Sequence, residues 1–192
     1  MAWNGVNDNS NPAFYRAVIK GMNKKAAPLV IVDMQPFFDA ANHKGTIKEC
    51  LKLISFAKRQ KALIILVEYD YYGKSCVELT RALRNYPHKM LVLKTRDNGG
   101  YEVFNALKEK GLSFKTYRFC GVNATCCVHD TISGLLSHQP KAKIEVVKEA
   151  CNDNNYSKKS SECWRRSAYT RPNVKLFANT AILRKKYLSA KH

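Results

Sequence analysis

Five short apolar runs rich in β-branched residues alternate along the chain with segments of helical spacing. With a weaker sixth, they are residues 29–33, 62–67, 90–93, 116–121, 144–147 and 174–177. After the first run, the apolar residues from Ile47 to Ala57 recur three and four positions apart, which is typical of an amphipathic helix. Similar spacing predicts helices near residues 77–83, 103–111 and 128–136. The alternation predicts an α/β fold, with a mainly parallel sheet and helices on both faces.

The order of the strands decides where a site would lie in such a fold. Right-handed crossovers bring every strand-to-helix loop to the carboxyl edge of the sheet, and ligands bind there beside the point where strand order reverses. Three reactive side chains follow three of the predicted strands: Asp33, Lys94 and the cysteines of GVNATCCVHD, residues 121–130. If the order is 3-2-1-4-5-6, the first and fourth strands are neighbours, and Asp33 faces the cysteine loop.

Each of these side chains has a chemical use at that edge. A cysteine in the first turn of a helix, with a lysine nearby, is expected to have a lowered thiol pKa. Asp33 can take the thiol proton and return it to a leaving amine. Lys94 can stabilise the thiolate and hold the carboxylate. Taken singly, each residue also fits an ordinary role: a turn cap, a surface lysine or a small buried side chain.

The adjacent cysteines Cys126 and Cys127 allow three interpretations: a redox pair, metal ligands, or one nucleophile with a neighbour. A disulfide between adjacent cysteines closes a strained ring, and thiol exchange more commonly uses CxxC spacing, so the redox pair is the weakest interpretation. The residues alone do not decide which cysteine would be the nucleophile.

The length of 192 residues fits one domain, expected at residues 28–192 after an N-terminal tail and short helix in residues 1–27. No apolar run approaches the roughly 20 residues of a membrane span, and the N-terminus lacks the pattern of a secretory signal. Seven cysteines without CxxC or Cys/His spacing favour free thiols in a reducing compartment. We expect a cytoplasmic protein.

The formal net charge of +18 is the unusual bulk property of the chain. Such a charge attracts nucleic acid through its phosphates. Against this, the basic residues are spread along the whole sequence, and none of the known nucleic-acid-binding motifs is present. The composition therefore favours a solvated basic surface over a nucleic-acid site, and excludes no partner by itself.

The motifs resemble those of the isochorismatase-like hydrolases, a superfamily that includes nicotinamidases and amidases. The resemblance rests on LVIVDMQPFF, a lysine after the third strand, GVNATCCVHDT and EVVKEACND, and covers about residues 28–183. Residues 177–183 are similar to the family's last strand and turn. The resemblance implies a three-layer α/β/α sandwich with a six-stranded sheet in the order assumed above.

The resemblance also implies roles for single residues. The family's nucleophile lies six residues after the glycine, which is Cys127 counted from Gly121, and Cys126 becomes its packed neighbour. Asp33 would be the general base and acid, and Lys94 the third member of a triad. The peptide before Asn123 would be cis, and the backbone N–H groups of Asn123 and Cys127 would form an oxyanion hole.

Several positions depart from the family pattern. Tyr72 stands where nicotinamidases have the first histidine of a metal site, so we expect no metal and no cofactor. The segment from Asp97 to Phe104 replaces the usual Ser-Ala-Phe and would reshape the pocket wall. Side chains expected to bind substrate are Gln35, Phe37, Tyr72 and Tyr101.

Together these features predict a metal-independent cysteine hydrolase that cleaves a C–N bond, other than a peptide bond, in a small amide or ureido compound through a thioester. The altered segments leave an alternative: a catalytically idle protein of this fold that serves as a binding or scaffold module for an anionic partner. The resemblance further implies a homo-oligomer, a dimer or tetramer, and no association with a membrane.

Overall fold

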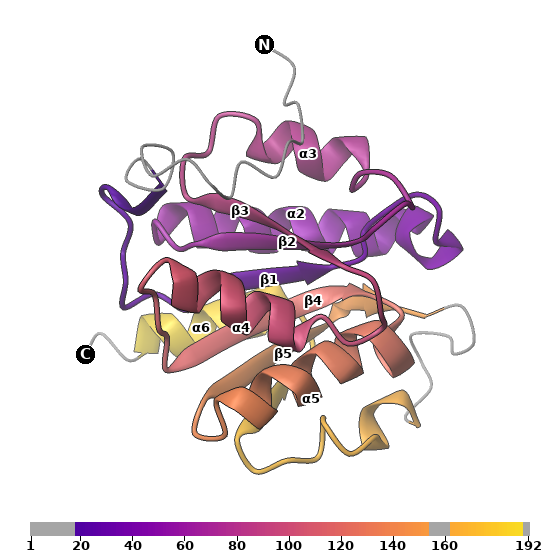
Figure 1. Cartoon of the computed structure of the whole chain (residues 1–192). Coiled ribbons are helices and arrows are strands. Elements are labelled where there is room, and N and C mark those ends of the chain that lie inside the picture. The colour runs from indigo at the N-terminus through magenta and orange to yellow at the C-terminus, as the bar shows by residue number, and fades with distance from the viewer. Residues whose placement is uncertain (1–17, 154–161, 190–192) are drawn as a thin grey trace.

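The computed structural model describes residues 18–153 and 162–189. Its centre is a six-stranded sheet in the order β3-β2-β1-β4-β5-β6, and every neighbouring pair of strands is parallel. The strands are β1 Leu29–Val32, β2 Ile64–Tyr69, β3 Lys89–Lys94, β4 Thr116–Val122, β5 Lys143–Asn152 and β6 Val174–Phe177 (Figure 1). The predicted strand order is confirmed.

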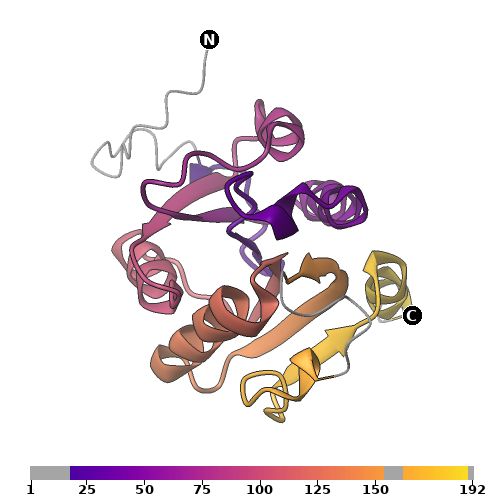
Figure 2. The ribbon, with the colours of Figure 1, turned by 90° about the vertical axis from the view of Figure 1, so that its right-hand side faces the viewer.

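Helices cover both faces of this sheet. They are α2 Lys44–Arg59, α3 Val77–Leu83, α4 Gly100–Glu109, α5 His129–His138 and α6 Thr180–Ser189, with short turns η1 Asp39–Asn42, η2 Ala124–Val128 and η3 Cys163–Arg165. Figure 2 shows α4 and α5 on one side of the sheet and α2 and α6 on the other. The predicted three-layer α/β/α sandwich is confirmed.

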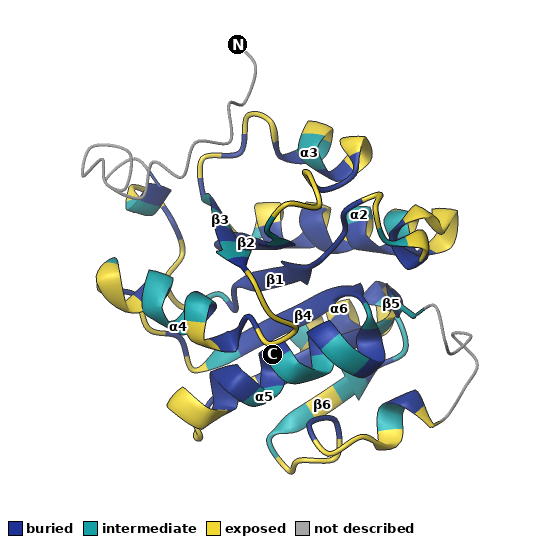
Figure 3. Cartoon of the chain, turned by 45° about the vertical axis from the view of Figure 1, so that its right-hand side comes forward, coloured by how far each residue is buried: buried dark blue, intermediate teal, exposed yellow. Residues whose placement is uncertain are grey.

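Burial follows the position of each strand in the sheet. All four residues of the central strand β1 are buried, because helices cover both of its faces. The edge strand β3 instead alternates between half-buried and buried residues. Figure 3 shows this pattern, with exposed residues concentrated in loops and on the outer faces of the helices. The continuous apolar run of β1 thus reflects its central place in the sheet.

Two elements differ from the sequence-based expectation. β5 was expected over residues 144–147 but continues to Asn152, and its pairing with β4 shifts register between Phe119 and Gly121. The chain beyond β6 was expected to turn, but it forms helix α6, whose start is capped by Asn179 Oδ1 accepting the Ile182 N–H at 3.1 Å. A polar Asn-Thr pair before an amphipathic stretch marked that start.

Only part of the predicted N-terminal helix, residues 13–22, falls within the described residues. Of that part, Val18 and Ile19 are helical, and Val18 is buried in the core. Residues 13–17 lie outside the described part of the chain.

The crevice for a site lies between the carboxyl ends of β1 and β4, where the strand order reverses. Gly121 makes the close approach of these strands possible: its φ is +131°, and a Cβ there would lie 2.1 Å from the Val32 carbonyl oxygen. Gly100 has a similar effect one layer away, because a Cβ there would lie 2.2 Å from the Leu135 nitrogen of α5. Gly100, one of the two glycines in the altered segment, therefore lets α4 pack tightly on α5.

Candidate active site

Asp33 and Lys94 form a buried ion pair at the carboxyl edge of the sheet. Lys94 ends β3 and Asp33 follows β1, so the lysine side chain reaches across the end of β2, a distance of about two strand spacings or 10 Å. Its Nζ lies 2.9 Å from Asp33 Oδ2, and neither side chain is exposed. Lys94 Nζ also donates to the carbonyl oxygens of Arg96 at 3.1 Å and Asp97 at 3.3 Å.

The Asp33 carboxylate has acceptor capacity to spare. Its contact with Lys94 is short enough for an ion pair and the Cys127 thiol lies within reach, but neither carboxylate oxygen accepts a well-aligned hydrogen bond. Burial raises the pKa of Asp33, and the charge of Lys94 opposes this rise. The residue also has a φ of 53°, which is uncommon outside glycine. A carboxylate in this state is suited to take up and release a proton.

Cys127 lies opposite this ion pair, in the π-helical turn η2 between β4 and α5. Its side chain is buried, with 3% of the residue exposed, and lies within hydrogen-bonding reach of the Asp33 carboxylate. Its Sγ also donates to Asp97 Oδ1 at 3.6 Å and accepts from Asn123 Nδ2 at 3.7 Å. The three side chains that the sequence placed at one edge are therefore brought together.

The expected lowering of the Cys127 thiol pKa is wrong. Burial raises this pKa well above its usual value, and the charges of Asp33 and Asp97 raise it further, while Lys94 lowers it. Burial and two carboxylates outweigh one ammonium, so the resting sulfur is a thiol. A nucleophile in this environment needs a base to remove its proton as it attacks.

The loop before Cys127 is held by a distinctive backbone turn. Asn123 has φ 58° and ψ 54°, and its carbonyl oxygen accepts from the N–H groups of Cys126 at 2.9 Å and Val128 at 3.2 Å. The described residues contain no cis peptide bond, so the cis peptide expected before Asn123 is wrong. The left-handed conformation of Asn123 provides the change of chain direction at the end of β4.

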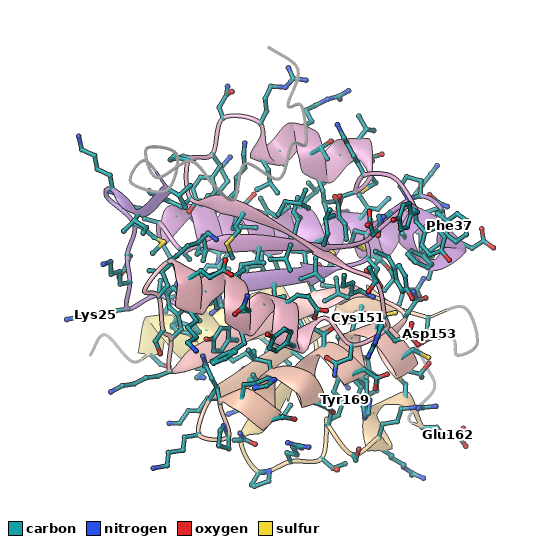
Figure 4. All side chains as sticks on the ribbon, in the orientation of Figure 1. Lys25, Phe37, Cys151, Asp153, Glu162 and Tyr169 are labelled. Atoms are coloured by element: carbon teal, nitrogen blue, oxygen red, sulfur yellow. The ribbon has the colours of Figure 1, made fainter. Side chains whose placement is uncertain are left out.

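Asp153 and Tyr169 anchor the same turn from the β5 side. One carboxylate oxygen of Asp153 accepts from the Thr125 N–H at 2.7 Å and from the Thr125 hydroxyl at 2.6 Å. The Tyr169 hydroxyl donates to the Ala124 carbonyl oxygen at 2.5 Å. Figure 4 shows Asp153 and Cys151 at the same edge of the sheet as Phe37, with Lys25 at the opposite edge.

Sequence reasoning missed Asp97 and Asp153. Asp97 lies three residues after Lys94, in the loop at the carboxyl edge of the sheet where we expected the site. Its carboxylate could therefore have been named as a candidate site residue. Asp153 follows β5 directly, but the predicted strand ended six residues earlier. Thr131 supports Asp97 indirectly: its hydroxyl accepts the Gly99 N–H at 3.1 Å and contacts the Asp97 carbonyl oxygen at 3.5 Å.

The four side chains expected to bind substrate lie in different surroundings. Gln35 is buried, and its amide holds the loop after β2: it donates to the carbonyl oxygens of Tyr69 at 2.9 Å and Gly73 at 2.6 Å, and accepts the Tyr69 N–H at 2.7 Å. The rings of Phe37 and Tyr72 stack at 4.0 Å with 3° between their planes. Tyr101 lies apart from them, against His138 at the end of α5.

Cys126 differs from Cys127 in its contacts. It is half-buried, packs against the core, and its Sγ lies 3.8 Å from the Thr125 hydroxyl. All seven cysteines are free. Within residues 18–153 and 162–189, no group of three or more His, Cys, Asp or Glu side chains could hold a metal ion. In the same part of the chain, no helix has the length and apolar character to cross a membrane.

Comparison with known proteins identifies the fold. The chain matches no protein-family model and no curated protein sequence. It is similar to the solved structure of an isochorismatase-like hydrolase from Alkaliphilus metalliredigens, with a TM-score of 0.61, 17% identity, and coverage of 87% of this chain and 100% of that one.

Two further structures show how widely this fold is used. N-carbamoylsarcosine amidase from Thermoplasma acidophilum has a TM-score of 0.60 at 18% identity, covering 79% of this chain and 95% of that one. The MAR1 ribonuclease of Caenorhabditis elegans has a TM-score of 0.55 at 19% identity, covering 69% and 67%. Proteins that share this fold thus include hydrolases that act on different substrates. The protein has the fold of the isochorismatase-like hydrolases.

Proposed function

We propose that this protein is a cysteine hydrolase that cleaves the C–N bond of a small amide or ureido compound. The observation that carries the proposal is the position of Asp33, a buried carboxylate in contact with both Lys94 and the Cys127 thiol. Such a carboxylate can accept the thiol proton when the sulfur attacks, and can return it when the nitrogen leaves. The amidase among the proteins of this fold supports the same reaction class.

The first half of the reaction forms a thioester. The Cys127 sulfur bonds to the carbonyl carbon while its proton passes to Asp33. The backbone N–H groups of Asn123 and Cys127, at the turn after β4, would stabilise the negative charge that develops on the carbonyl oxygen. The C–N bond then breaks, and the proton held by Asp33 passes to the departing nitrogen, which leaves as ammonia or an amine.

The second half regenerates the enzyme. Asp33, now ionised again, removes a proton from a water molecule, and the resulting hydroxide adds to the thioester carbon. The C–S bond breaks, the product leaves as a carboxylic or carbamic acid, and the sulfur regains a proton from Asp33. Lys94 supports both halves, because its charge compensates the buried carboxylate.

The charges around the thiol favour neutral or cationic substrates. Asp33 and Asp97 both act on Cys127, and Lys94 supplies the opposing charge. A substrate with a carboxylate beside its scissile carbonyl would add a further negative charge to this group. The exposed Phe37 and Tyr72 pair provides a flat apolar surface at the same edge, suited to a small planar group.

The adjacent cysteines provide a matched test. Ammonia release is measured over a panel of small amides and ureido acids, for the natural protein and for the variants Cys127→Ala and Cys126→Ala. We expect Cys127→Ala to lose turnover and Cys126→Ala to keep it within a few fold. Intact mass after acid quench should show the acyl group on the natural protein and on Cys126→Ala, but not on Cys127→Ala. Turnover that survives in Cys127→Ala would refute the mechanism.

The alternative of a catalytically idle scaffold was motivated by two departures from the family pattern, Tyr72 and the segment after Lys94. The packing of Gly100 against α5 explains that segment without loss of the site. An idle protein would show no turnover and no acyl adduct with any amide of the panel, so the same experiment separates the two functions. The homo-oligomer expected from the resemblance remains a prediction, tested by light scattering.

A further inference from the structure

The edge of the sheet opposite Cys127 carries two grooves, one on the side of α6 and one on the side of α4 and α5, which meet at Lys141. They lie where β4, β5 and β6 begin, with volumes of about 410 and 420 Å³. The first is lined by Lys141, Lys143, Lys175 and Lys186, and the second by Lys115 and again by Lys141. We call these five lysines the lysine strip. They are up to 71 positions apart in the sequence (186 − 115), so the dispersed charge of the sequence is concentrated here by the fold.

The strip has an excess of positive charge. Glu145 is the one carboxylate that lines either groove, and it is already bound by Arg118 at 2.9 Å and Lys186 at 2.5 Å. The other four lysines are exposed, and none of them forms an ion pair with a carboxylate in the part of the chain that the structure describes. Four uncompensated ammonium groups therefore face solvent along one edge.

The strip is elongated along the edge. In the parallel register, Lys143 pairs with Thr116 of β4, and Glu145 pairs with Lys175 of β6. Lys143 and Lys175 thus come from two neighbouring strands about 5 Å apart, and Lys115 directly precedes the adjacent strand β4, so these lysines extend over roughly 10 Å across three strand starts. A row of charges along an open groove suits a polymer with repeated negative charges better than a single small anion.

Aromatic rings continue the second groove. Phe104 lines it, and its ring stacks on His138 at 4.9 Å with 11° between the planes. The Tyr101 ring also contacts His138, at 5.4 Å, and is 55% exposed. Lysines along a groove with exposed rings at one end form the arrangement that binds single-stranded nucleic acid, where phosphates meet the cations and bases stack on the rings. An acidic protein partner would not require the rings.

We propose that the lysine strip and the rings of Tyr101, Phe104 and His138 bind single-stranded nucleic acid. The lysine strip lies at the opposite edge of the sheet from Asp33, Lys94 and Cys127, so its contacts with phosphates do not depend on the proposed hydrolase activity.

The test measures binding of a fluorescein-labelled 12-nucleotide oligouridylate to the full chain by anisotropy, at 50 and 200 mM salt. The strip variant changes Lys115, Lys141, Lys143 and Lys175 to Gln. The control variant changes Lys44, Lys48, Arg81 and Arg84 to Gln; these are exposed residues of α2 and of the end of α3 and its cap. Each variant lowers the formal net charge by four, from +18 to +14.

We expect the strip variant to lose most of the salt dependence. With a slope of about −0.7 per phosphate contact, four contacts account for a roughly 50-fold drop in affinity between the two salt concentrations. The control variant should keep the affinity of the natural protein within about threefold. A variant with arginine in place of the four strip lysines should also keep it, because the charge is unchanged. Equal losses in the strip and control variants would show non-specific attraction and would overturn the proposal.

The rings are tested separately. His138→Ala should weaken binding about tenfold without changing the salt slope, because it removes a stacking surface and not a fixed charge. Unchanged affinity in this variant would overturn the assignment to nucleic acid. A 12-residue polyglutamate should compete poorly with the labelled oligonucleotide. If it displaced the label at the same concentration as unlabelled oligouridylate does, the assignment to nucleic acid would be overturned in favour of an acidic protein partner. Melting temperatures check that every variant is folded.

Discussion

The structure contains two buried ion pairs at opposite ends of one sheet, and they are built differently. At the amino end, Arg118 of β4 contacts Glu145 of β5 through two nitrogens, at 2.9 and 3.2 Å. The same carboxylate accepts from the Lys186 ammonium and from the Tyr187 hydroxyl. The Arg118 guanidinium also lies between two rings, 4.9 Å from Phe56 and 5.1 Å from Tyr187.

At the carboxyl end, Asp33 has one cationic partner, Lys94, and neither of its oxygens has a hydrogen-bond partner. The difference shows what each pair is suited for. A carboxylate whose acceptor sites are filled, like Glu145, contributes to the fold. A carboxylate with empty acceptor sites beside a thiol can change its protonation. The under-bonded pair is the one we assign to chemistry.

The largest expected effect separates the two carboxylates by activity. Asp33→Asn removes the base for both halves of the reaction, and we expect at least a 1,000-fold loss of turnover, within the range of about 10² to 10⁴ for general acid–base catalysis. Glu145→Gln should change turnover less than fivefold, because Glu145 lies at the opposite edge. Ammonia release measures both. The comparison breaks if Asp33→Asn keeps a tenth of the activity.

The free energy of unfolding should depend more on the Arg118–Glu145 pair than on the Asp33–Lys94 pair. Arg118→Met leaves the Glu145 charge with fewer partners in the core, and we expect about 3–5 kcal/mol less free energy of unfolding. Asp33→Asn should cost less, because burial opposes the charged form of Asp33 and Lys94 keeps its hydrogen bonds to the carbonyl oxygens of Arg96 and Asp97. Urea denaturation measures both values. A larger loss for Asp33→Asn would contradict the comparison.

Much of this arrangement could be predicted from the sequence, because it depends on periodicity and chain order. The apolar run at 29–33 indicated a strand, and the assumed strand order then placed Asp33 beside the cysteine loop, as the pairing of β1 with β4 confirms. Gly111 was expected to end a helix, and it does so with a φ of +60° after α4. These features depend on neighbours in the sequence or on topology rules that apply to the whole fold class.

Other parts depend on distances that a sequence does not contain. The lowered thiol pKa was expected from Lys94 and the helix start, but the burial of Cys127 and the proximity of Asp97 reverse its direction. The end of β5 was not visible, because residues 148–149 are charged and interrupt the apolar run. The lysine strip likewise forms only when the starts of three strands are placed side by side.

The raised thiol pKa predicts how Cys127 affects stability in alkaline solution. The unfolded thiol ionises near its ordinary pKa of 9.0, whereas the folded thiol keeps its proton to higher pH. Above pH 9 the unfolded state therefore binds fewer protons, and the free energy of unfolding falls by up to about 1.4 kcal/mol per pH unit from this group. Cys127→Ala should show a shallower fall between pH 9 and 10 in urea denaturation. Equal slopes would mean that the thiol is not held protonated.

The smallest expected effect concerns Asp97, the second carboxylate at the thiol. Its charge contributes to the raised pKa of Asp33, and Asp33 must be ionised to accept the thiol proton. Activity should therefore rise with pH through the folded pKa of Asp33, and Asp97→Asn should move this acid limb of kcat/KM to lower pH. Asp97→Glu, which keeps the charge, serves as the control and should leave the limb in place. An acid limb that disappears in Asp97→Asn would instead identify Asp97, at 3.6 Å from the sulfur, as the base, and would remove Asp33 from that role.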